Sequence, residues 1–225
     1  MTNGRTLLGL LLILLGRAPA LAEPPPPPKT VLDHAHELGT GRFQGWAYGE
    51  DAAKKQVDCV QFVEAVLEAA RGAKVTPDAS RAVRIQGLST TPGDQAAIAK
   101  AVEAGDRRLA GVVHAIVDVL GEGVAVPFAE AKPGDFVQCW WRRERKEPDP
   151  ADPKKTRTVV RWEGHAAIVE SVVEADPKRK ASTVRIYGSH RSLGGVGIAP
   201  SVVSLEDAAD RRMFVARFTG PKAPK

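Results

Sequence analysis

The sequence predicts an α+β domain in which helices pack on one side of an antiparallel sheet of five or six strands. Two observations support this fold class. Apolar residues recur at helical spacing behind N-capping residues in the first half of the chain, and runs of small and β-branched residues separated by turns fill the second half. With 225 residues and 43% hydrophobic content, the chain can bury one ordinary core, so we expect a single domain.

The first 22 residues have the pattern of a signal peptide. Arg5 precedes an apolar run over residues 7–15, and residues 20–22 fit a cleavage site made of small residues. Because the apolar run is too short to cross a bilayer as a permanent helix, we expect residues 1–22 to be removed and no membrane span to remain. The protein should then be secreted or periplasmic.

Five consecutive prolines follow at residues 24–28, and residues 23–29 are therefore predicted to form a stiff, extended linker. Removal of the signal peptide takes away Arg5 and Arg17, which lowers the formal net charge from +5 to +3. This mild basicity is compatible with an anionic cell wall and does not predict a nucleic-acid partner.

Several helices are expected before the sheet. Residues 31–38 predict a short helix, Thr91 is the expected N-cap of a helix that reaches about residue 104, and Asp106 begins a longer helix that ends before Gly121. The chain has no zinc-type cysteine spacing and no phosphate-binding loop. No metal or organic cofactor is implied.

The segment around Cys59 predicts a capped amphipathic helix with a thiol in its first turn. Asp58 is a suitable N-cap, Gln61 can complete a capping box, and Gly72 closes the apolar pattern. Unpaired N–H groups and the positive end of the helix dipole surround such a thiol, which favours the thiolate. A thiolate at this place is a suitable nucleophile if a base lies nearby.

Three later segments supply candidates for the base and its partner. Residues 164–173 predict a strand with His165 at its opening, and residues 132–138 predict a turn that feeds another strand. A further strand over residues 183–190 ends in polar residues. Cysteine on a helix, histidine on a strand and a polar residue on the next strand is the order of a Cys-His-polar triad.

These motifs resemble those of the NlpC/P60 superfamily, a group of papain-like cell-wall peptidases and amidases. The resemblance covers roughly residues 30–218, and we assign the corresponding catalytic domain to residues 30–220. The matching motifs, in chain order, are Tyr48-Gly49, Asp58-Cys59, Pro133-Gly134-Asp135-Phe136 and Gly164-His165-Ala166-Ala167-Ile168-Val169.

The resemblance implies a papain-like fold, with Cys59 as the nucleophile, His165 as the general base and acid, and Tyr48 as a residue that lines the site. Val60-Gln61 stands where typical members have Ser-Gly, which is closer to amidase-like branches. The charged residues 142–161 also replace a short turn of the typical domain, and they should form a solvated loop or the tip of a long hairpin.

Asp58 and Trp140 complete the expected substrate-binding residues. Trp140, Trp141 and Trp162 flank the charged segment, and one of them can form a wall of a substrate cleft because aromatic faces pack well on sugars and peptides. Packing in the core and in the hairpin is the alternative role for all three.

The third catalytic residue is expected at the end of the strand over residues 183–190. The family has His, Asn or Gln at this position, so His190 is the expected residue, with Ser189 and Tyr187 as alternatives. A period of two puts His190 on one face of this strand and the other two residues on the opposite face. Its role is to hold the imidazole of His165 by the far nitrogen.

The sequence therefore predicts an exported cysteine hydrolase that cleaves an amide bond, in cell-wall peptide or in another amide substrate. An acyltransferase would use the same residues with an acceptor other than water. Two alternatives belong to other classes: a catalytically inactive binding domain of the same fold, and a secreted domain stapled by a disulfide between Cys59 and Cys139. Without that disulfide, Cys139 fits a small buried hydrophobic residue.

Overall fold

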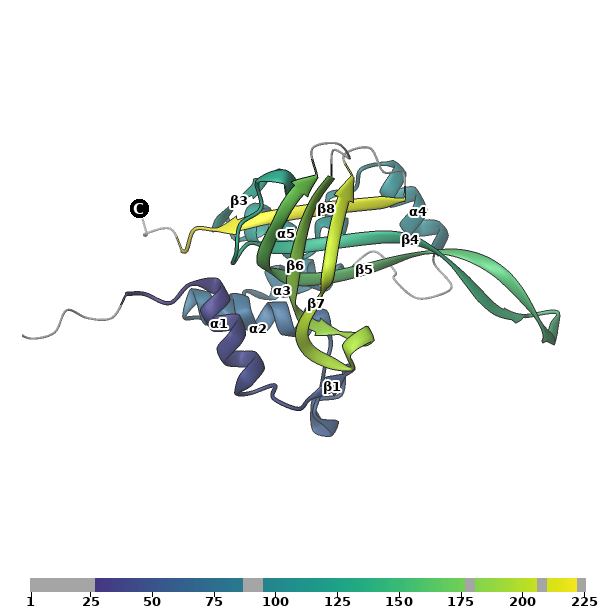
Figure 1. Cartoon of the computed structure of the whole chain (residues 1–225), viewed down its shortest axis with the longest axis horizontal. Coiled ribbons are helices and arrows are strands. Elements are labelled where there is room, and N and C mark those ends of the chain that lie inside the picture. Colours follow the sequence, from purple (N-terminus) through teal and green to yellow (C-terminus); the bar gives the residue numbers. More distant parts are fainter. Residues whose placement is uncertain (1–26, 87–94, 177–180, 206–209, 222–225) are drawn as a thin grey trace, which may run out of the picture.

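The computed structural model describes residues 27–86, 95–176, 181–205 and 210–221. Within these residues, an eight-stranded mixed sheet curls into a half-barrel, and short helices pack against it (Figure 1). The expected signal peptide, most of the proline run and the expected N-cap at Thr91 lie outside the described residues.

The strands follow one another along the chain with few helices between them after residue 120. Their order across the sheet is β2-β1-β7-β6-β5-β4-β8-β3, and every neighbouring pair except β1 and β2 is antiparallel. The strands are β1 (Ala47–Tyr48), β2 (Gln56–Val57), β3 (Gly123–Val126), β4 (Phe136–Asp149), β5 (Asp152–Asp176), β6 (Ala181–His190), β7 (Gly195–Leu205) and β8 (Arg211–Phe218).

The helices are short and lie mostly in the first half of the chain. They are α1 (Val31–Thr40), α2 (Cys59–Arg71), α3 (Pro77–Val83), α4 (Gln95–Glu103) and α5 (Val112–His114), and α5 continues as a π-helical segment over Ala115–Val119. Single 3₁₀ turns occur at Ala52–Lys54, Arg107–Ala110, Phe128–Glu130 and Arg191–Leu193.

The predicted fold class is therefore wrong: the chain does not form a papain-like α+β domain with helices on a sheet of five or six strands. The sheet has eight strands and dominates the structure. Three of the strands, β1, β2 and β3, have only two to four residues, which is too short to leave a periodic pattern in the sequence. The long helix expected after Asp106 is also broken.

That break occurs at Gly111. Asp106 caps a 3₁₀ turn, as its carboxylate accepts a hydrogen bond from the Arg108 N–H, and the chain then reaches Gly111 at φ 47° and ψ −114°. A Cβ atom on Gly111 would lie 2.6 Å from the side-chain oxygen of Gln138. Both the backbone conformation and the close approach of β4 therefore require glycine here.

The helix around Cys59 forms where the sequence predicts it. The Asp58 carboxylate accepts a hydrogen bond from the Gln61 N–H at 2.6 Å, and the Gln61 side chain accepts one from the Asp58 N–H at 3.1 Å. Gly72 ends the helix in the left-handed conformation. The helix packs on β5 and β6 through the buried residues Phe62, Val63, Val66 and Leu67.

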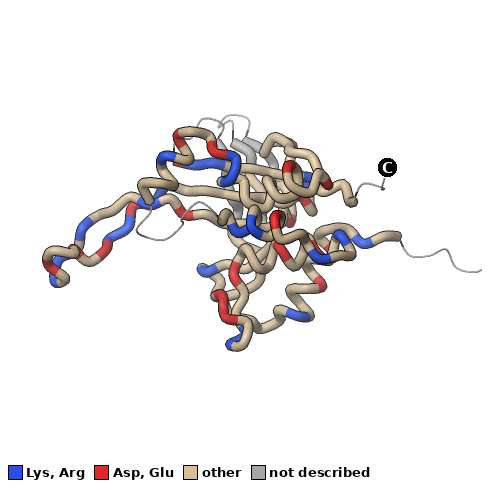
Figure 2. Tube along the Cα trace, turned by 180° about the vertical axis from the view of Figure 1, so that it is seen from behind, with Lys and Arg blue, Asp and Glu red and all other residues tan. Residues whose placement is uncertain are grey.

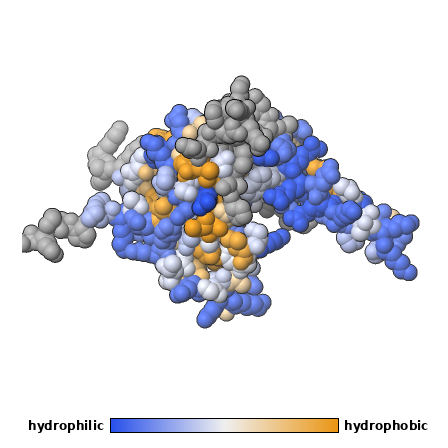
Figure 3. Space-filling view, in the orientation of Figure 1, coloured by the Kyte–Doolittle hydropathy of each residue, from blue (hydrophilic) through white to orange (hydrophobic). Residues whose placement is uncertain are grey.

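The charged residues 142–161 form a long hairpin, which is one of the two expected alternatives. In this segment, called the arm below, β4 and β5 stay paired and project away from the rest of the molecule (Figure 1). Basic and acidic residues are interspersed along it (Figure 2), and its surface is largely hydrophilic (Figure 3). An isolated two-stranded ribbon is marginally stable in water. Cross-strand ion pairs, Arg145 with Glu163 and Arg161 with Glu147, support the arm near its base.

The two faces of the sheet belong to different apolar cores. Phe136 and Ile168 pack with the helices, whereas Val137 and Val169, one residue further along the same strands, belong to a second core on the opposite face. His165 is an even number of residues from Val169. Its side chain therefore projects to the face of the second core.

We expect Gly111→Ala to lower the free energy of unfolding by about 3 kcal/mol, because alanine meets both an unfavourable backbone conformation and the Gln138 side chain. Gly45→Ala is the matched control, since Gly45 also has a positive φ, 71°, but has open space where its Cβ would lie. The control should cost about 1 kcal/mol. Urea unfolding of both variants measures the difference, and equal losses would contradict the packing argument.

Candidate active site

The sheet splits between β5 and β6. The last pair of their ladder is Ile168 with Tyr187, while β5 continues along β4 and β6 continues along β7 towards β1 (Figure 1). Continuing that register by three residues brings His165 opposite His190, and their ring centroids lie 4.6 Å apart. The sequence predicted that His165 opens a strand. In the structure it lies well inside β5.

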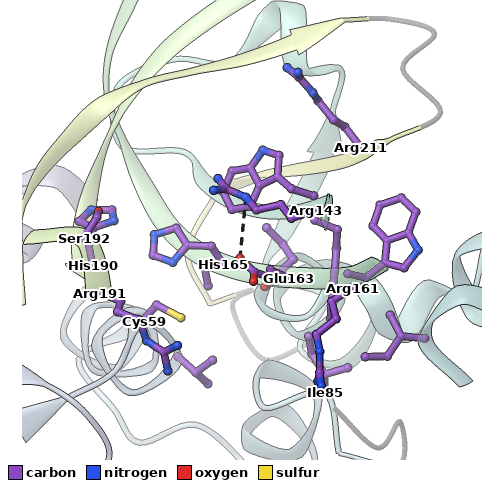
Figure 4. A pocket seen from close by; sticks show the side chains of 18 of the residues that line it. Cys59, Ile85, Arg143, Arg161, Glu163, His165, His190, Arg191, Ser192 and Arg211 are labelled. Atoms are coloured by element: carbon purple, nitrogen blue, oxygen red, sulfur yellow. Dashed lines mark ion pairs between the residues drawn. The ribbon is translucent and has the colours of Figure 1, made fainter. Parts of the chain in front are cut away.

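A pocket of about 1050 Å³ opens at this split. Its lining comes from the start of α2, from the sheet and from the base of the arm. Figure 4 shows Cys59, His165, His190 and Arg191 at one end of the pocket, and Arg143, Arg161 and Glu163 further along it.

Cys59 reaches the split from the helical side. It is the first residue of α2 and is 6% exposed. Its sulfur accepts a hydrogen bond from the backbone N–H of Ala166, which lies beyond the end of the β5–β6 ladder and is therefore free of β6. The hydroxyl oxygen of Tyr48, on β1, lies 4.0 Å from the same sulfur. The start of α2 is thus fixed next to the residue that follows His165.

The two histidines each keep one ring nitrogen without a partner. Nε2 of His165 and Nε2 of His190 are buried and have no hydrogen-bond partner among the described residues. Buried polar atoms are nearly always paired, so two such atoms in adjacent rings mark a place that can take up a proton or a ligand atom. Trp141 stacks on His165, with 6.3 Å between the ring centroids, and limits its movement.

Of the three candidates for the third catalytic residue, His190 is the one that lies against His165. The Ser189 hydroxyl donates a hydrogen bond to the Val57 carbonyl at 2.6 Å and so ties β6 to the start of α2. Tyr187 is on the helical face, where its ring lies 5.8 Å from that of Phe62.

Asp58 and Trp140, both expected to bind substrate, are held in structural contacts. The Asp58 carboxylate caps α2, and Asp58 is not among the residues that line the pocket. Trp140 borders the pocket but is 2% exposed, and its indole N–H donates to the Leu109 carbonyl at 2.7 Å. The half-buried Trp141 beside it is the tryptophan that presents its ring to the pocket.

The Pro-Gly-Asp motif fixes the turn before β4. The buried Asp135 carboxylate accepts a hydrogen bond from the Lys132 N–H at 2.8 Å and pairs with Arg217 of β8 at 2.9 Å. The Gly134 N–H donates to the Val169 carbonyl at 2.9 Å. These contacts set the register of β4 against β5, and Asp135 takes no direct part in the pocket.

Burial controls the protonation states of the candidate catalytic residues. It raises the pKa of the Cys59 thiol, and the nearby Asp58 carboxylate adds to this, against the Ala166 N–H and the Tyr48 hydroxyl. Burial also lowers the pKa of His165 to about 3, with a further contribution from His190, and lowers the pKa of His190 to about 4. The resting pair is therefore a thiol and a neutral imidazole.

The prediction that Cys59 rests as a thiolate is therefore not supported, because burial changes the thiol pKa more than the helix dipole does. A helix dipole contributes about 0.3–1 kcal/mol at its first turn, less than one pKa unit. Full burial can shift a pKa by about 3–5 units in the direction of the neutral form. For Cys59, at 6% exposure, the larger effect wins.

The disulfide alternative is not observed, because both cysteines are free. Cys139 is fully buried on β4 in the second core, and burial raises the pKa of its thiol. It pairs with His165 across the β4–β5 ladder, so its backbone supports the strand that carries the histidine.

The basic groups of the pocket were not predicted from the sequence. Six arginines and two glutamates line it, and they come from five separate elements or turns of the fold. A period-two pattern was present on both arm strands: Trp141, Arg143 and Arg145 on β4, and Arg161, Glu163 and His165 on β5. That pattern indicates one continuous face of the sheet that also carries His165.

Comparisons with protein families, curated proteins and solved structures give no match to this chain. None of the described helices is both long and apolar enough to cross a membrane. The described residues also hold no cluster of three or more His, Cys, Asp or Glu side chains that could bind a metal ion.

Alkylation of Cys59 by iodoacetamide should accelerate steadily as the pH rises above about 8, because the reactive thiolate forms only above a raised thiol pKa. No plateau is expected in mildly acidic solution, since His165 stays neutral down to a pH of about 3. Rates on the Cys139→Ser variant, followed by mass spectrometry of the labelled peptide, measure this. A plateau between about pH 4 and 7 would instead reveal a thiolate–imidazolium pair.

The lowered pKa values of His165 and His190 also predict loss of stability in acid. Their folded-state pKa values, about 3 and about 4, lie below the unfolded value of 6.5, so the unfolded chain binds more protons below that pH. Stability should be complete above about pH 6.5 and fall by roughly 3 kcal/mol per histidine by pH 4. Urea unfolding at several pH values should show a shallower fall for His165→Gln than for wild type or for His34→Gln on α1.

Proposed function

We propose that the protein is an exported cysteine hydrolase that cleaves an amide bond, with cell-wall peptide as its substrate. The observation that carries this proposal is the position of Cys59. Its sulfur accepts a hydrogen bond from the N–H of the residue after His165, at the end of a pocket that also contains His190. A buried thiol from α2 and an imidazole from β5, far apart in the sequence, thus line the same pocket.

The first step is nucleophilic attack by the Cys59 sulfur on the substrate carbonyl. Because the thiol and the imidazole are both neutral at rest, the thiol proton passes to His165 as the bond to carbon forms. The positive charge on His165 then lies beside the neutral His190 ring, whose free Nε2 can accept a hydrogen bond from it. His190 thereby orients and stabilises the protonated base.

The oxyanion of the tetrahedral intermediate needs a hydrogen-bond donor near the sulfur. The first turn of α2 offers the N–H of Cys59, because the Asp58 carboxylate interacts with those of Val60 and Gln61, whereas the Cys59 N–H interacts only with its own sulfur. This N–H lies at the positive end of the helix, where developing negative charge is favoured.

The intermediate collapses when protonated His165 gives its proton to the leaving amine, which departs and leaves a thioester on Cys59. A water molecule then attacks the thioester, with His165 again as the base, and releases the carboxylic acid and the free thiol. The pocket of about 1050 Å³ is large enough for a peptide segment on either side of the scissile bond.

Two parts of the proposal, the export of the protein and its cell-wall substrate, are supported by the sequence alone. The signal-peptide pattern of residues 1–22, the proline linker and the four motifs that resemble the NlpC/P60 superfamily support cell-wall peptide as the target. The half-barrel sheet does not add to that resemblance.

Incubation with purified cell wall, followed by mass analysis of the released fragments, tests the activity. Cys59→Ser and His165→Ala should each lower turnover by about a thousandfold or more, and the double variant should lose no more than either alone because nucleophile and base act together. His190→Ala should cost about ten- to a hundredfold, since an orienting group accepts no proton.

Cys139→Ser is the control, and it should keep near wild-type turnover because that thiol lies in the second core. Near-normal turnover of His165→Ala would refute the catalytic pair. Products that carry an added amine, when one is supplied, would show transfer to an acceptor other than water.

A further inference from the structure

The basic groups of the pocket concentrate positive charge close to Cys59. Six of its lining residues are arginines, two are glutamates, and none is lysine or aspartate. Charge of one sign on the walls of a cleft raises the local concentration of ligands of the opposite sign. The catalytic end of the pocket therefore favours anionic ligands.

Most of these arginines are already engaged with carboxylates. Arg143 and Arg145 pair with Glu163, and Arg161 pairs with Glu147. Their charges are partly neutralised within the arm and its base. Two more arginines of the pocket have carboxylate partners outside it, which are Glu64 for Arg84 and Asp210 for Arg211.

Arg191 differs from the other five. No described carboxylate lies within ion-pair distance of it, and its guanidinium carbon lies 5.6 Å from the centroid of the Tyr48 ring. Stacking on an aromatic ring holds the planar group while leaving its N–H groups free for a ligand. Arg191 directly follows His190 in the sequence, and the hydroxyl of Tyr48 is 4.0 Å from the Cys59 sulfur.

We propose, on the basis of the proposed function, that Arg191 is a specificity-determining residue that binds a carboxylate on the acyl part of the substrate. The substrate class is an amide whose acyl group carries a carboxylate close to the scissile carbonyl. The fork of the guanidinium matches a carboxylate with two parallel hydrogen bonds. Tyr48 sets the position of this fork relative to the nucleophile.

A matched pair of thiol reagents tests this without relying on hydrolysis. Iodoacetate and iodoacetamide deliver the same electrophilic carbon to a thiolate, and only the first carries a carboxylate. We expect the rate ratio of iodoacetate to iodoacetamide at Cys59, measured in the Cys139→Ser background at about pH 8.5, to exceed the ratio for free cysteine. Arg191→Gln should lower the ratio at Cys59 about fivefold, the effect of one solvent-accessible charge pair.

Arg42→Gln is the matched control. Arg42 also stacks on an aromatic ring, that of Phe43 at 4.8 Å, but it does not line the pocket. Its removal changes the net charge equally and should leave the ratio unchanged. Equal effects of the two substitutions, or a ratio at Cys59 no higher than that of free cysteine, would overturn the inference.

The outcomes separate this inference from the proposed function. A raised, Arg191-dependent ratio without amide hydrolysis would support the anion site and count against the hydrolase. Hydrolysis of cell wall with a ratio equal to that of free cysteine would support the hydrolase and reject the role of Arg191. If neither reagent labels Cys59, the pocket does not deliver ligands to the thiol, and both proposals fail.

Discussion

The Ala166 N–H can donate a hydrogen bond to the Cys59 sulfur because the pairing of β5 with β6 ends at Ile168 and Tyr187. This hydrogen bond places Cys59 beside the residue that follows His165, and the arrangement of the site depends on it. Had β5 and β6 stayed paired beyond Ile168 and Tyr187, β6 would lie where the sulfur now lies. The curl of the sheet makes the separation possible, because each strand keeps a partner on its other side. At the split, β5 and β6 each lose one neighbour, and the Ala166 N–H on the freed edge of β5 interacts with the Cys59 sulfur instead.

The split also explains why Cys59, His165 and His190 are uncharged at rest. Packing three side chains that can titrate into one buried gap disfavours every charged form, which gives a thiol and two neutral imidazoles. In the proposed mechanism, charge appears only when the proton leaves the sulfur. A neutral resting pair protects a buried thiol from adventitious oxidants, which react with thiolates. Arg143 and Arg161 lie further along the pocket, where solvent reduces the cost of holding them near one another.

Local features were predictable from the sequence, and their arrangement was not. The capping box at Asp58 and Gln61 and the period-two pattern that separates His190 from Tyr187 are set by neighbours within a few residues. The fold class was wrong because two-residue strands such as β1 carry no pattern, and they form only when a long-range partner such as Gly195 of β7 is present. The broken helix at Gly111 likewise depends on Gln138, which lies in a distant strand.

The same distinction explains why Trp140 was a poor choice and Trp141 a better one. Adjacent residues of a strand face opposite sides, so choosing between them requires knowing which side holds the pocket. The register of β4 and β5, which pairs Cys139 with His165, places Trp141 on the same face of the sheet as His165. The same parity places Arg143, Arg161 and Glu163 on the face of the sheet that carries His165. The arm therefore extends the face of the sheet that carries His165, and its charged side chains near the base line the same pocket as Cys59.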